Sequence, residues 1–280
     1  MITRQRFTAT AEPVTSSLAS LGSAFVGKMA FSTVVVMLLL ATAAQAQEDS
    51  ARRILKAMSD YVTSQMTISL TFDTDIEVIT PEIQKIQFSS SGQVQLSRPD
   101  KLRASRTGGY ADVELTFDGK TATVLGKNVN TYAQVGAPGS IDALVDKLRA
   151  NYSIDMPGAD LLLSRVYDEL IADAIDAKHI GQGVIDGVEC EHLAFRNADV
   201  DWQLWVEVGA RPIPRKYVIT SKAVTGAPQY VLRIKQWRTD AAASPDAFVF
   251  KPPADAKKVD AAALRDIDEV PPGIVIGGQK

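Results

Sequence analysis

Two residues with nucleophile and base chemistry lie close together in the second half of the chain. Cys190 is the only cysteine, and His192, one of two histidines, follows it at a spacing that puts both side chains on one face of a strand. A thiol beside an imidazole is the pairing of a cysteine hydrolase. The pattern supplies no third residue to orient the imidazole and no helix N-terminus to activate the thiol. It therefore favours an ordinary strand in a protein that is not an enzyme.

The other chemistry-bearing residues match no ligand or cofactor pattern. Cys190, His179 and His192 do not have the spacing of a zinc site, and the glycines match neither phosphate-binding loop. Acidic pairs such as Asp73 with Asp75 fall on polar strand positions or in loops, where carboxylates are solvated. We therefore expect no metal and no cofactor.

Arg98 breaks the alternation of its strand. It has the parity of Val94 and Leu96, which form the apolar face, and Pro99 follows it directly. A guanidinium on an apolar face is costly unless it is hydrogen-bonded, and proline ends or edges a strand. Two interpretations stay open. Arg98 reaches water at the rim of the sheet, or it points into a concave interior and binds backbone carbonyls of a covering helix.

Most of the chain alternates between apolar and polar residues, as half-buried antiparallel strands do. We expect strands at 67–78, 86–96, 113–117 and 121–125, around Tyr132, from His179, and at 202–208, 215–220 and 230–237. Asp118-Gly119 and Asp186-Gly187 are turn signals between strands. Helical spacing follows Asp49, a candidate N-cap, and resumes after a second candidate cap, Ser140, with a break at Pro157-Gly158.

The N-terminal region predicts export. Arg4, Arg6 and Lys28 precede an uncharged run, Ala30 to Ala44, which ends in Ala44-Gln45-Ala46. Basic, apolar and small-x-small segments in this order are typical of a secretory signal peptide. The run is shorter than the roughly 20 residues that a membrane anchor needs. We expect cleavage of residues 1–46, a mature chain without a membrane anchor, and a location in the periplasm.

The mature chain is expected to be acidic and to fold without disulfides. Its 234 residues suffice for one large core, and its net charge of about −5 offers no attraction to nucleic acid or to an anionic lipid surface. A single cysteine precludes an internal disulfide. We expect one domain over 47–258, with a helical insertion at about 140–173, and a flexible tail over 259–280.

Several motifs resemble a known family. Gly92–Arg103, with its Arg98-Pro99 step, is similar to a strand and turn of the outer-membrane lipoprotein carrier superfamily, and Phe248–Pro253 resembles its closing strand. A closer resemblance is to a family of predicted periplasmic proteins of unknown function within that superfamily. Its blocks resemble Asp199–Trp205, Arg211–Lys216 and Gly226–Tyr230. Together the resemblance spans roughly residues 50–259.

The resemblance implies an α+β fold: a curved, half-open antiparallel β-barrel wrapped around helices, with an apolar cavity between the sheet and a helical lid. The apolar strand positions expected to line this cavity are Leu70, Phe72, Ile76, Phe88, Val94, Leu96, Leu115 and Phe117. The first helix, over 52–62, is expected to pack there through Ile54, Met58 and Tyr61. In the superfamily an arginine before the proline locks the lid, and Arg98 matches that position.

We therefore expect a periplasmic, non-catalytic binding protein for a lipid-like or other apolar ligand, such as the acyl chains of a lipoprotein. The alternative is an envelope sensor or scaffold that binds another protein through the same fold, and a cysteine–histidine hydrolase is the remote alternative. The positions of Trp202, Trp205 and Trp237 discriminate between the first two, since an outer patch of tryptophans is typical of a protein interface. The tryptophan-rich segment 199–215 and the long helical insertion depart from a lipoprotein carrier.

Overall fold

The computed structural model describes residues 26–152, 154, 156–239, 244–264, 267–271 and 274. The chain divides into two compact units, Met1–Ala43 and Ala44–Lys280. Arg4 and Arg6 of the expected signal peptide lie outside the described residues. Over the described part of the chain, no helix combines the length and the hydropathy that a membrane crossing requires.

Helix α1, Val26–Ser64, contains the boundary between the two units. The expectation that Asp49 caps a helix is wrong, because the backbone is already helical before it. Residues 41–48 include no glycine or proline and are rich in alanine and glutamine, which favour helix. The sequence therefore continues one helix where a cap had been expected.

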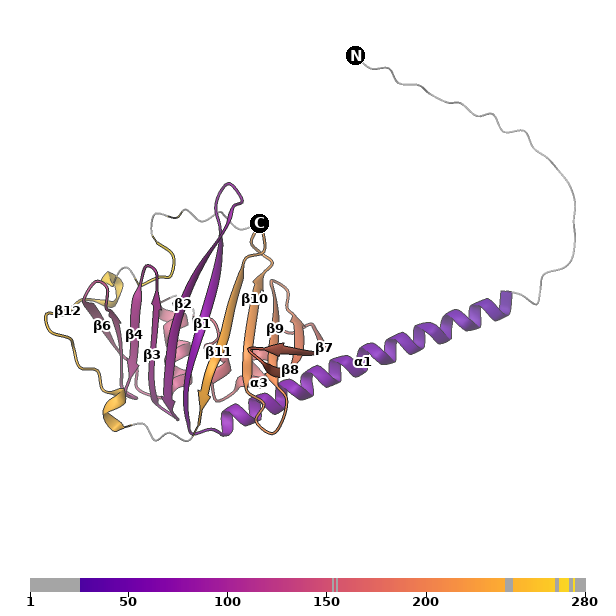
Figure 1. Cartoon of the computed structure of the whole chain (residues 1–280), viewed down its shortest axis with the longest axis horizontal. Helices are drawn as coiled ribbons and strands as arrows, with labels where there is room; N and C mark the ends of the chain where they lie inside the picture. The colour runs from indigo at the N-terminus through magenta and orange to yellow at the C-terminus, as the bar shows by residue number, and fades with distance from the viewer. Residues whose placement is uncertain are drawn as a thin grey trace, which may run out of the picture. The chain divides into compact units, whose positions relative to one another are not determined.

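The second unit contains a twelve-stranded sheet with the order β12-β6-β5-β4-β3-β2-β1-β11-β10-β9-β8-β7 (Figure 1). Neighbouring strands are antiparallel, except that β12 runs parallel to β6. The strands are β1 Thr67–Ile79, β2 Lys85–Ser97, β3 Lys101–Gly108, β4 Asp112–Phe117, β5 Thr121–Gly126, β6 Thr131–Gly136, β7 Asp176–Ile185, β8 Val188–Arg196, β9 Val200–Glu207, β10 Pro214–Ser221, β11 Gln229–Arg238 and β12 Lys257–Lys258. Because β7 and β12 end the order without pairing to each other, the barrel is open. The expected half-open antiparallel fold is confirmed.

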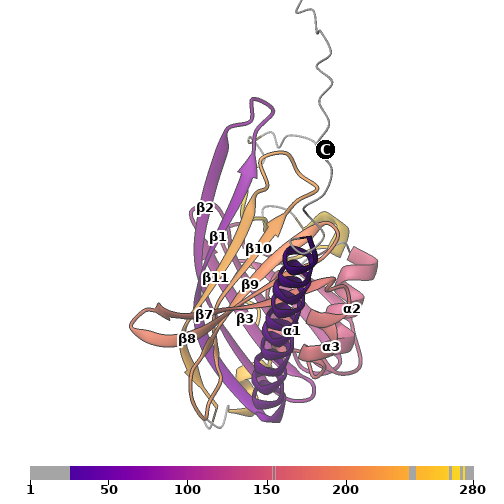
Figure 2. The same ribbon diagram turned by 90° about the vertical axis from the view of Figure 1, so that its right-hand side faces the viewer.

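Helices cover one side of this sheet. The insertion between β6 and β7 contains α2 (Ile141–Tyr152), the short 3₁₀ helix η1 (Ala159–Leu162) and α3 (Val166–Ile171), and α2 and α3 lie on the same side of the sheet (Figure 2). The C-terminal turns of α1 contribute Leu55, Met58 and Val62, each completely buried in the same core as the strand residues. Met58 therefore packs as expected, whereas Ile54 and Tyr61 are only partly buried against that core.

The insertion begins and breaks where the sequence indicates. Ser140 accepts a hydrogen bond at Oγ from the backbone N–H of Ala143, 3.2 Å away, so it is the N-cap of α2. Gly158 has a φ of 86° and lies against β11, where an added Cβ would be 2.7 Å from a methyl carbon of Leu232. After this break the helical spacing resumes in two short pieces, η1 and α3.

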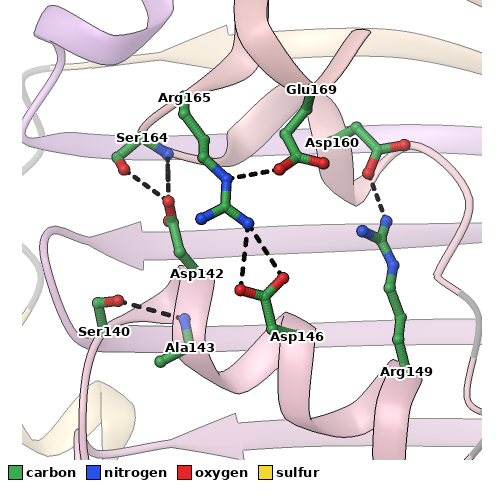
Figure 3. A network of polar contacts seen from close by, with 9 residues as sticks. All are labelled: Ser140, Asp142, Ala143, Asp146, Arg149, Asp160, Ser164, Arg165 and Glu169. Carbon is green, nitrogen blue, oxygen red and sulfur yellow. Dashed lines mark hydrogen bonds and ion pairs between the residues drawn. The ribbon is translucent and has the colours of Figure 1, made fainter. Parts of the chain in front are cut away.

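Polar contacts tie the parts of the insertion to one another (Figure 3). The carboxylate of Asp142 accepts hydrogen bonds from the backbone N–H and the hydroxyl of Ser164. The remaining pairs are Arg165 with Asp146, Arg165 with Glu169, and Arg149 with Asp160. Helix α2, η1 and α3 are thereby joined as one helical unit.

Two strand expectations differ from the structure. Strand β3 was not anticipated, because its apolar face is short and only Leu102 and Ala104 mark it. The expected closing strand at Phe248–Pro253 is wrong: Phe248 ends a 3₁₀ helix, Pro245–Phe248, and the following residues are not in a strand. Two consecutive prolines, which cannot donate to a ladder, explain why this segment stays outside the sheet.

Candidate functional site

The helix-facing side of the sheet consists of rows of side chains that the strand register places side by side. The first row contains Ile68, Leu96, Leu102 and Phe117. The second row contains Leu70, Val94, Ala104 and Leu115. These rows form one apolar surface across β1, β2, β3 and β4, and the helices pack against it.

The eight side chains expected to line a cavity fall into three groups. The fully packed core contains Leu70, Leu96 and Phe117, which are at most 4% exposed. The side chains that are partly buried against this core are Phe72, Val94 and Leu115. The half-buried pair further along β1 and β2 is Ile76 and Phe88, which are direct cross-strand neighbours. Six residues are thus brought together, and a pair is set apart from them. A close-packed core has no room for a ligand. The second group, Phe72, Val94 and Leu115, is therefore the accessible part of this surface.

Helices contribute further partly buried apolar residues to the same core. Those that are partly buried against the core are Ile54 and Tyr61 from α1, and Tyr152, Ile154, Met156 and Leu162 from the insertion. Together with Phe72, Val94 and Leu115 they form a set of apolar side chains around this core that are neither fully packed nor fully exposed. We call this set the half-buried strip.

Arg98 lies where the first helix and the insertion meet the sheet. Its Nε donates a hydrogen bond to the carbonyl oxygen of Gln65, 3.1 Å away, just after α1 ends. Its backbone N–H donates to the carbonyl of Met66, and the next residue, Pro99, accepts a hydrogen bond from the backbone N–H of Ile141. The side chain thus binds a carbonyl at the end of a covering helix, which corresponds more closely to the second of the two interpretations.

The guanidinium of Arg98 is incompletely compensated. Burial lowers its pKa, and the nearby carboxylate of Asp142 opposes this shift. Among the described residues its Nη2 atom is buried and has no hydrogen-bond partner. A buried donor without a partner is energetically costly, so the Nη2 atom offsets part of the stabilisation that the hydrogen bond from Nε to Gln65 supplies.

A polar row, which the sequence interpretation missed, separates the half-buried strip from Ile76 and Phe88. Thr74 and Ser90 face each other on β1 and β2, with their hydroxyl oxygens 2.7 Å apart and both side chains buried. Arg106 of β3 and Tyr230 of β11 stand beside them on the same side of the sheet. The signal available in the sequence was polar residues at apolar-parity positions in neighbouring strands.

Residues of the C-terminal segment contact this polar row. Glu269 accepts a hydrogen bond from the Ser90 hydroxyl at 3.0 Å and lies 3.0 Å from Nη1 of Arg106. Arg106 Nη2 donates to the carbonyl of Ile267 at 2.6 Å. The expectation of a flexible tail over 259–280 does not account for these contacts at 267–269, which anchor part of the segment to the sheet.

Cys190 and His192 do not form a catalytic pair in this structure. The Cys190 side chain is completely buried and donates to the carbonyl of Val188, and burial raises the pKa of its thiol. The His192 ring stacks on Trp205 with centroids 4.0 Å apart, and its Nε2 lies 2.9 Å from the side-chain oxygen of Gln203. A raised pKa is the opposite of what a nucleophilic thiol needs.

The three tryptophans occupy different sides of the sheet. Trp202 is buried in the core, where it stacks on Phe195. Trp237 pairs with Leu70 and packs partly buried against the same core. Trp205 lies on the opposite side of its strand from Trp202, with Lys216 over its ring. The three side chains therefore do not gather into one outer patch.

The acidic residues considered above are engaged in ordinary surface contacts. Asp73 and Asp75 accept hydrogen bonds from Ser91 and Ser89 across the β1–β2 pair. Within the described ranges, no group of three or more histidine, cysteine, aspartate or glutamate side chains is placed to hold a metal ion.

Solved structures with a similar chain trace share little sequence with this protein. An uncharacterized conserved protein from Thermus thermophilus is 12% identical over 75% of this chain and 99% of its own, with a TM-score of 0.45. LprF from Mycobacterium bovis is 13% identical over 71% of this chain and 98% of its own, with a TM-score of 0.46. A LolA superfamily protein, NE2245 from Nitrosomonas europaea, is 13% identical over 71% and 97%, with a TM-score of 0.31.

The family assignment comes from the sequence. No curated protein matches the chain. A family model described as "Predicted periplasmic protein (DUF2092)" matches residues 51–262, which include every strand of the sheet. The resemblance to a family of predicted periplasmic proteins is thereby confirmed, and the chain belongs to the DUF2092 family.

Proposed function

We propose that this periplasmic protein is a non-catalytic binding protein that holds a lipid-like or other apolar ligand between its sheet and its helices. A ligand would lie along the half-buried strip, in contact with Phe72, Val94 and Leu115 on the sheet and with Met156 on the insertion. Burial of apolar surface drives such binding without any covalent step.

The observation that supports the proposal most directly is the half-buried strip itself. Its side chains pack against a completely buried core on one side yet keep part of their surface accessible. Each CH₂ group of an acyl chain contributes about 0.8 kcal/mol when it is buried. A chain of sixteen carbons thus gains on the order of 10 kcal/mol before the costs of ordering are subtracted.

The way in which the helical unit is attached supports an opening motion. Its internal contacts are polar and numerous (Figure 3), whereas its face toward the sheet is apolar. Hydrogen bonds join it to the sheet near its two ends, from Ile141 N–H to the Pro99 carbonyl and from Ile175 N–H to the Arg196 carbonyl, and Lys147 of α2 donates to the carbonyl of Gly136 at the end of β6. A unit that is rigid inside and packs on the sheet through an apolar face is able to lift from that surface as one body.

The rival function, an envelope sensor or scaffold, is favoured by a different surface. Ile180 and Val184 are 55% and 65% exposed on the β7–β8 hairpin, which projects from the rest of the sheet (Figure 2). Exposed apolar residues at such a site suit a protein partner. The tryptophan positions speak against this rival, because two of the three lie on the helix-facing side.

The test is native mass spectrometry of the protein purified from its own periplasm, combined with binding of a fluorescent fatty acid. Met156→Asp places a charge in the half-buried strip, and we expect it to lose both the co-purified lipid and the probe. Val184→Asp makes the same kind of change on the exposed hairpin and is the matched control, with binding unchanged. Wild-type protein that carries no lipid and binds no probe would overturn the proposal. If Val184→Asp alone impairs the protein in cells, the sensor interpretation is the better one.

A further inference from the structure

The hydroxyl groups of the polar row form a chain with a defined direction. Thr74 is hydrogen-bonded to Ser90, and Ser90 to the carboxylate of Glu269, while Tyr230 lies beside Thr74 as the cross-strand neighbour of Ile76. A carboxylate only accepts, so Ser90 donates its single proton to Glu269 and must accept from Thr74. Each hydroxyl therefore polarises the next, and the donor end of the chain points at one anionic group.

Arg106 adds a positive charge at the same point. Its side chain is 22% exposed and that of Glu269 is 15% exposed, so the pair is largely shielded from water. Burial lowers the pKa of Arg106, and neighbouring Tyr230 and Asp268 oppose that shift. Among the described residues, Nη1 of Arg106 is buried and makes no well-directed hydrogen bond in addition to this ion pair. A buried guanidinium of this kind is stable only with an anion beside it.

The anion is supplied by a segment that lies over the sheet instead of belonging to it. Ile267 places its Cγ2 atom 3.5 Å from the position that a Cβ on Gly126 would take. Gly126 is in the row of Val113, Arg106 and Gly92. The segment 267–269 therefore crosses the helix-facing side of β5, β3 and β2, beside the half-buried strip. Its contacts to the sheet include one ion pair and two hydrogen bonds.

We propose that Arg106, Ser90, Thr74 and Tyr230 form a binding site for the carboxylate headgroup of a single-chain amphiphile, and that Glu269 occupies this site as an internal competitor. The ligand's apolar chain would run along the half-buried strip, starting at Phe72, which is the cross-strand neighbour of Gly92 in the row of Arg106. The inference rests on the proposed function and specifies its ligand as an apolar acid. Displacement of the C-terminal segment is then a part of ligand entry.

The competition makes a quantitative prediction. A tethered competitor lowers the fraction of protein that is competent to bind, and the apparent Kd rises by the same factor. Glu269→Gln retains the size of the side chain but removes the charge that holds it to Arg106. We expect this variant to bind dodecanoate about tenfold more tightly than wild type, which corresponds to about 1.4 kcal/mol.

The experiment measures dodecanoate, dodecanol and acetate binding by titration calorimetry. The full chain is expressed, the exported protein is delipidated, and folding is confirmed by circular dichroism. Glu82→Gln, which removes an exposed carboxylate between β1 and β2, is the matched control. Arg106→Gln removes the cation, and Arg106→Lys retains a charge without the planar fork of donors. If Arg106→Gln does not fold, the comparison of Glu269→Gln with Glu82→Gln still decides the question.

The outcomes separate the two proposals. Tighter binding of dodecanoate but not of dodecanol by Glu269→Gln, with Glu82→Gln unchanged, supports the carboxylate site. Acetate bound as tightly as dodecanoate would mean that the site takes a free small anion, which overturns the inference. Equal affinities for acid and alcohol in every variant overturn it too, while leaving an apolar binding protein intact. Failure of both twelve-carbon ligands to bind any variant contradicts the proposed function itself.

Discussion

The Nε atom of Arg98 donates a hydrogen bond to the carbonyl oxygen of Gln65 across a distance of 3.1 Å. Gln65 directly follows α1, and Pro99 accepts a hydrogen bond from Ile141 at the start of α2. The Arg98-Pro99 step therefore joins the end of one helix to the beginning of another, at the edge of the apolar surface that both helices cover.

Arg98→Leu is expected to bind a fluorescent fatty-acid probe more tightly than wild type. A hydrogen bond from a charged donor contributes about 1.5–3 kcal/mol, so its loss shifts a closed–open balance toward the open form by about tenfold or more. The variant should fold, because leucine also removes a buried donor without a partner. It should expose more apolar surface, measured by dye binding, with circular dichroism as the check of folding.

Two further variants control this test. Arg98→Lys should restore wild-type affinity only in part, since an ammonium does not reproduce the donors of the guanidinium. Arg233→Leu makes the same change at an exposed position of β11 and should leave the probe affinity unchanged. Equal affinity for wild type and Arg98→Leu would mean that Arg98 only stabilises the junction, and the idea of a lid lock would be abandoned.

The mature N-terminus is predicted to be Gln47. A basic segment, an apolar segment and a small-x-small motif follow one another in this order, which places cleavage after Ala46. This position lies within helix α1. N-terminal sequencing of protein from a periplasmic fraction is the measurement. Intact chains that begin before Ala30 and sediment with membranes would show that the segment is retained.

The strands of the sheet were predictable because each is specified by its own alternation. β1, β2, β4, β5 and β8 to β11 were anticipated within a few residues, as were the turn at Asp186-Gly187 and the cap at Ser140. Strand β3 escaped because its apolar face is short: Arg106 follows Leu102 and Ala104 on the inner side. Local periodicity has no signal for a strand whose inward residues are partly charged.

The polar row could not be assembled from the sequence because its members are far apart in the chain. Thr74 and Ser90 are polar residues at positions with the parity of the apolar face, and nothing local connects Arg106 with Glu269. Only the register between β1, β2 and β3 brings the first three together. The half-buried strip was anticipated in part, since Phe72, Val94 and Leu115 follow from parity, whereas Leu96 and Phe117 turned out to be completely enclosed.

Cys190 is expected to be unreactive in the folded protein. Burial raises the pKa of its thiol and keeps reagents away from it. Modification by a thiol-specific reagent should be slow in buffer and fast in urea, as followed by mass spectrometry. Cys190→Ala should bind the fatty-acid probe with wild-type affinity. A rapid native reaction, or loss of function in this variant, would revive the hydrolase hypothesis.

Asp142 is expected to stabilise the helical unit far more than its neighbour Asp146. Asp142 is buried and accepts hydrogen bonds from both the backbone and the hydroxyl of Ser164, so Asp142→Ala should lower the free energy of unfolding by about 1–3 kcal/mol. Asp146 and its partner Arg165 are 52% and 43% exposed. Asp146→Ala should therefore cost at most about 1 kcal/mol. Urea denaturation of both variants measures the difference, and equal losses would contradict this account of the network.

Tyr230 is expected to make stability fall at alkaline pH. Burial raises the pKa of its hydroxyl to about 12, although the neighbouring Arg106 and Thr74 act in the opposite direction. The unfolded value is about 10. Because the folded state holds this proton more tightly, its contribution is fully present below pH 10 and is lost as the pH rises toward 12. The loss should be about 2 kcal/mol in the free energy of unfolding.

Tyr230→Phe should flatten the decline, while Tyr217, whose pKa burial also raises, contributes equally to both proteins. Urea denaturation at several pH values between 9 and 12 is the measurement. Parallel curves for wild type and Tyr230→Phe would mean that burial does not hold the Tyr230 hydroxyl in its neutral form, and Tyr230 would be removed from the proposed headgroup site.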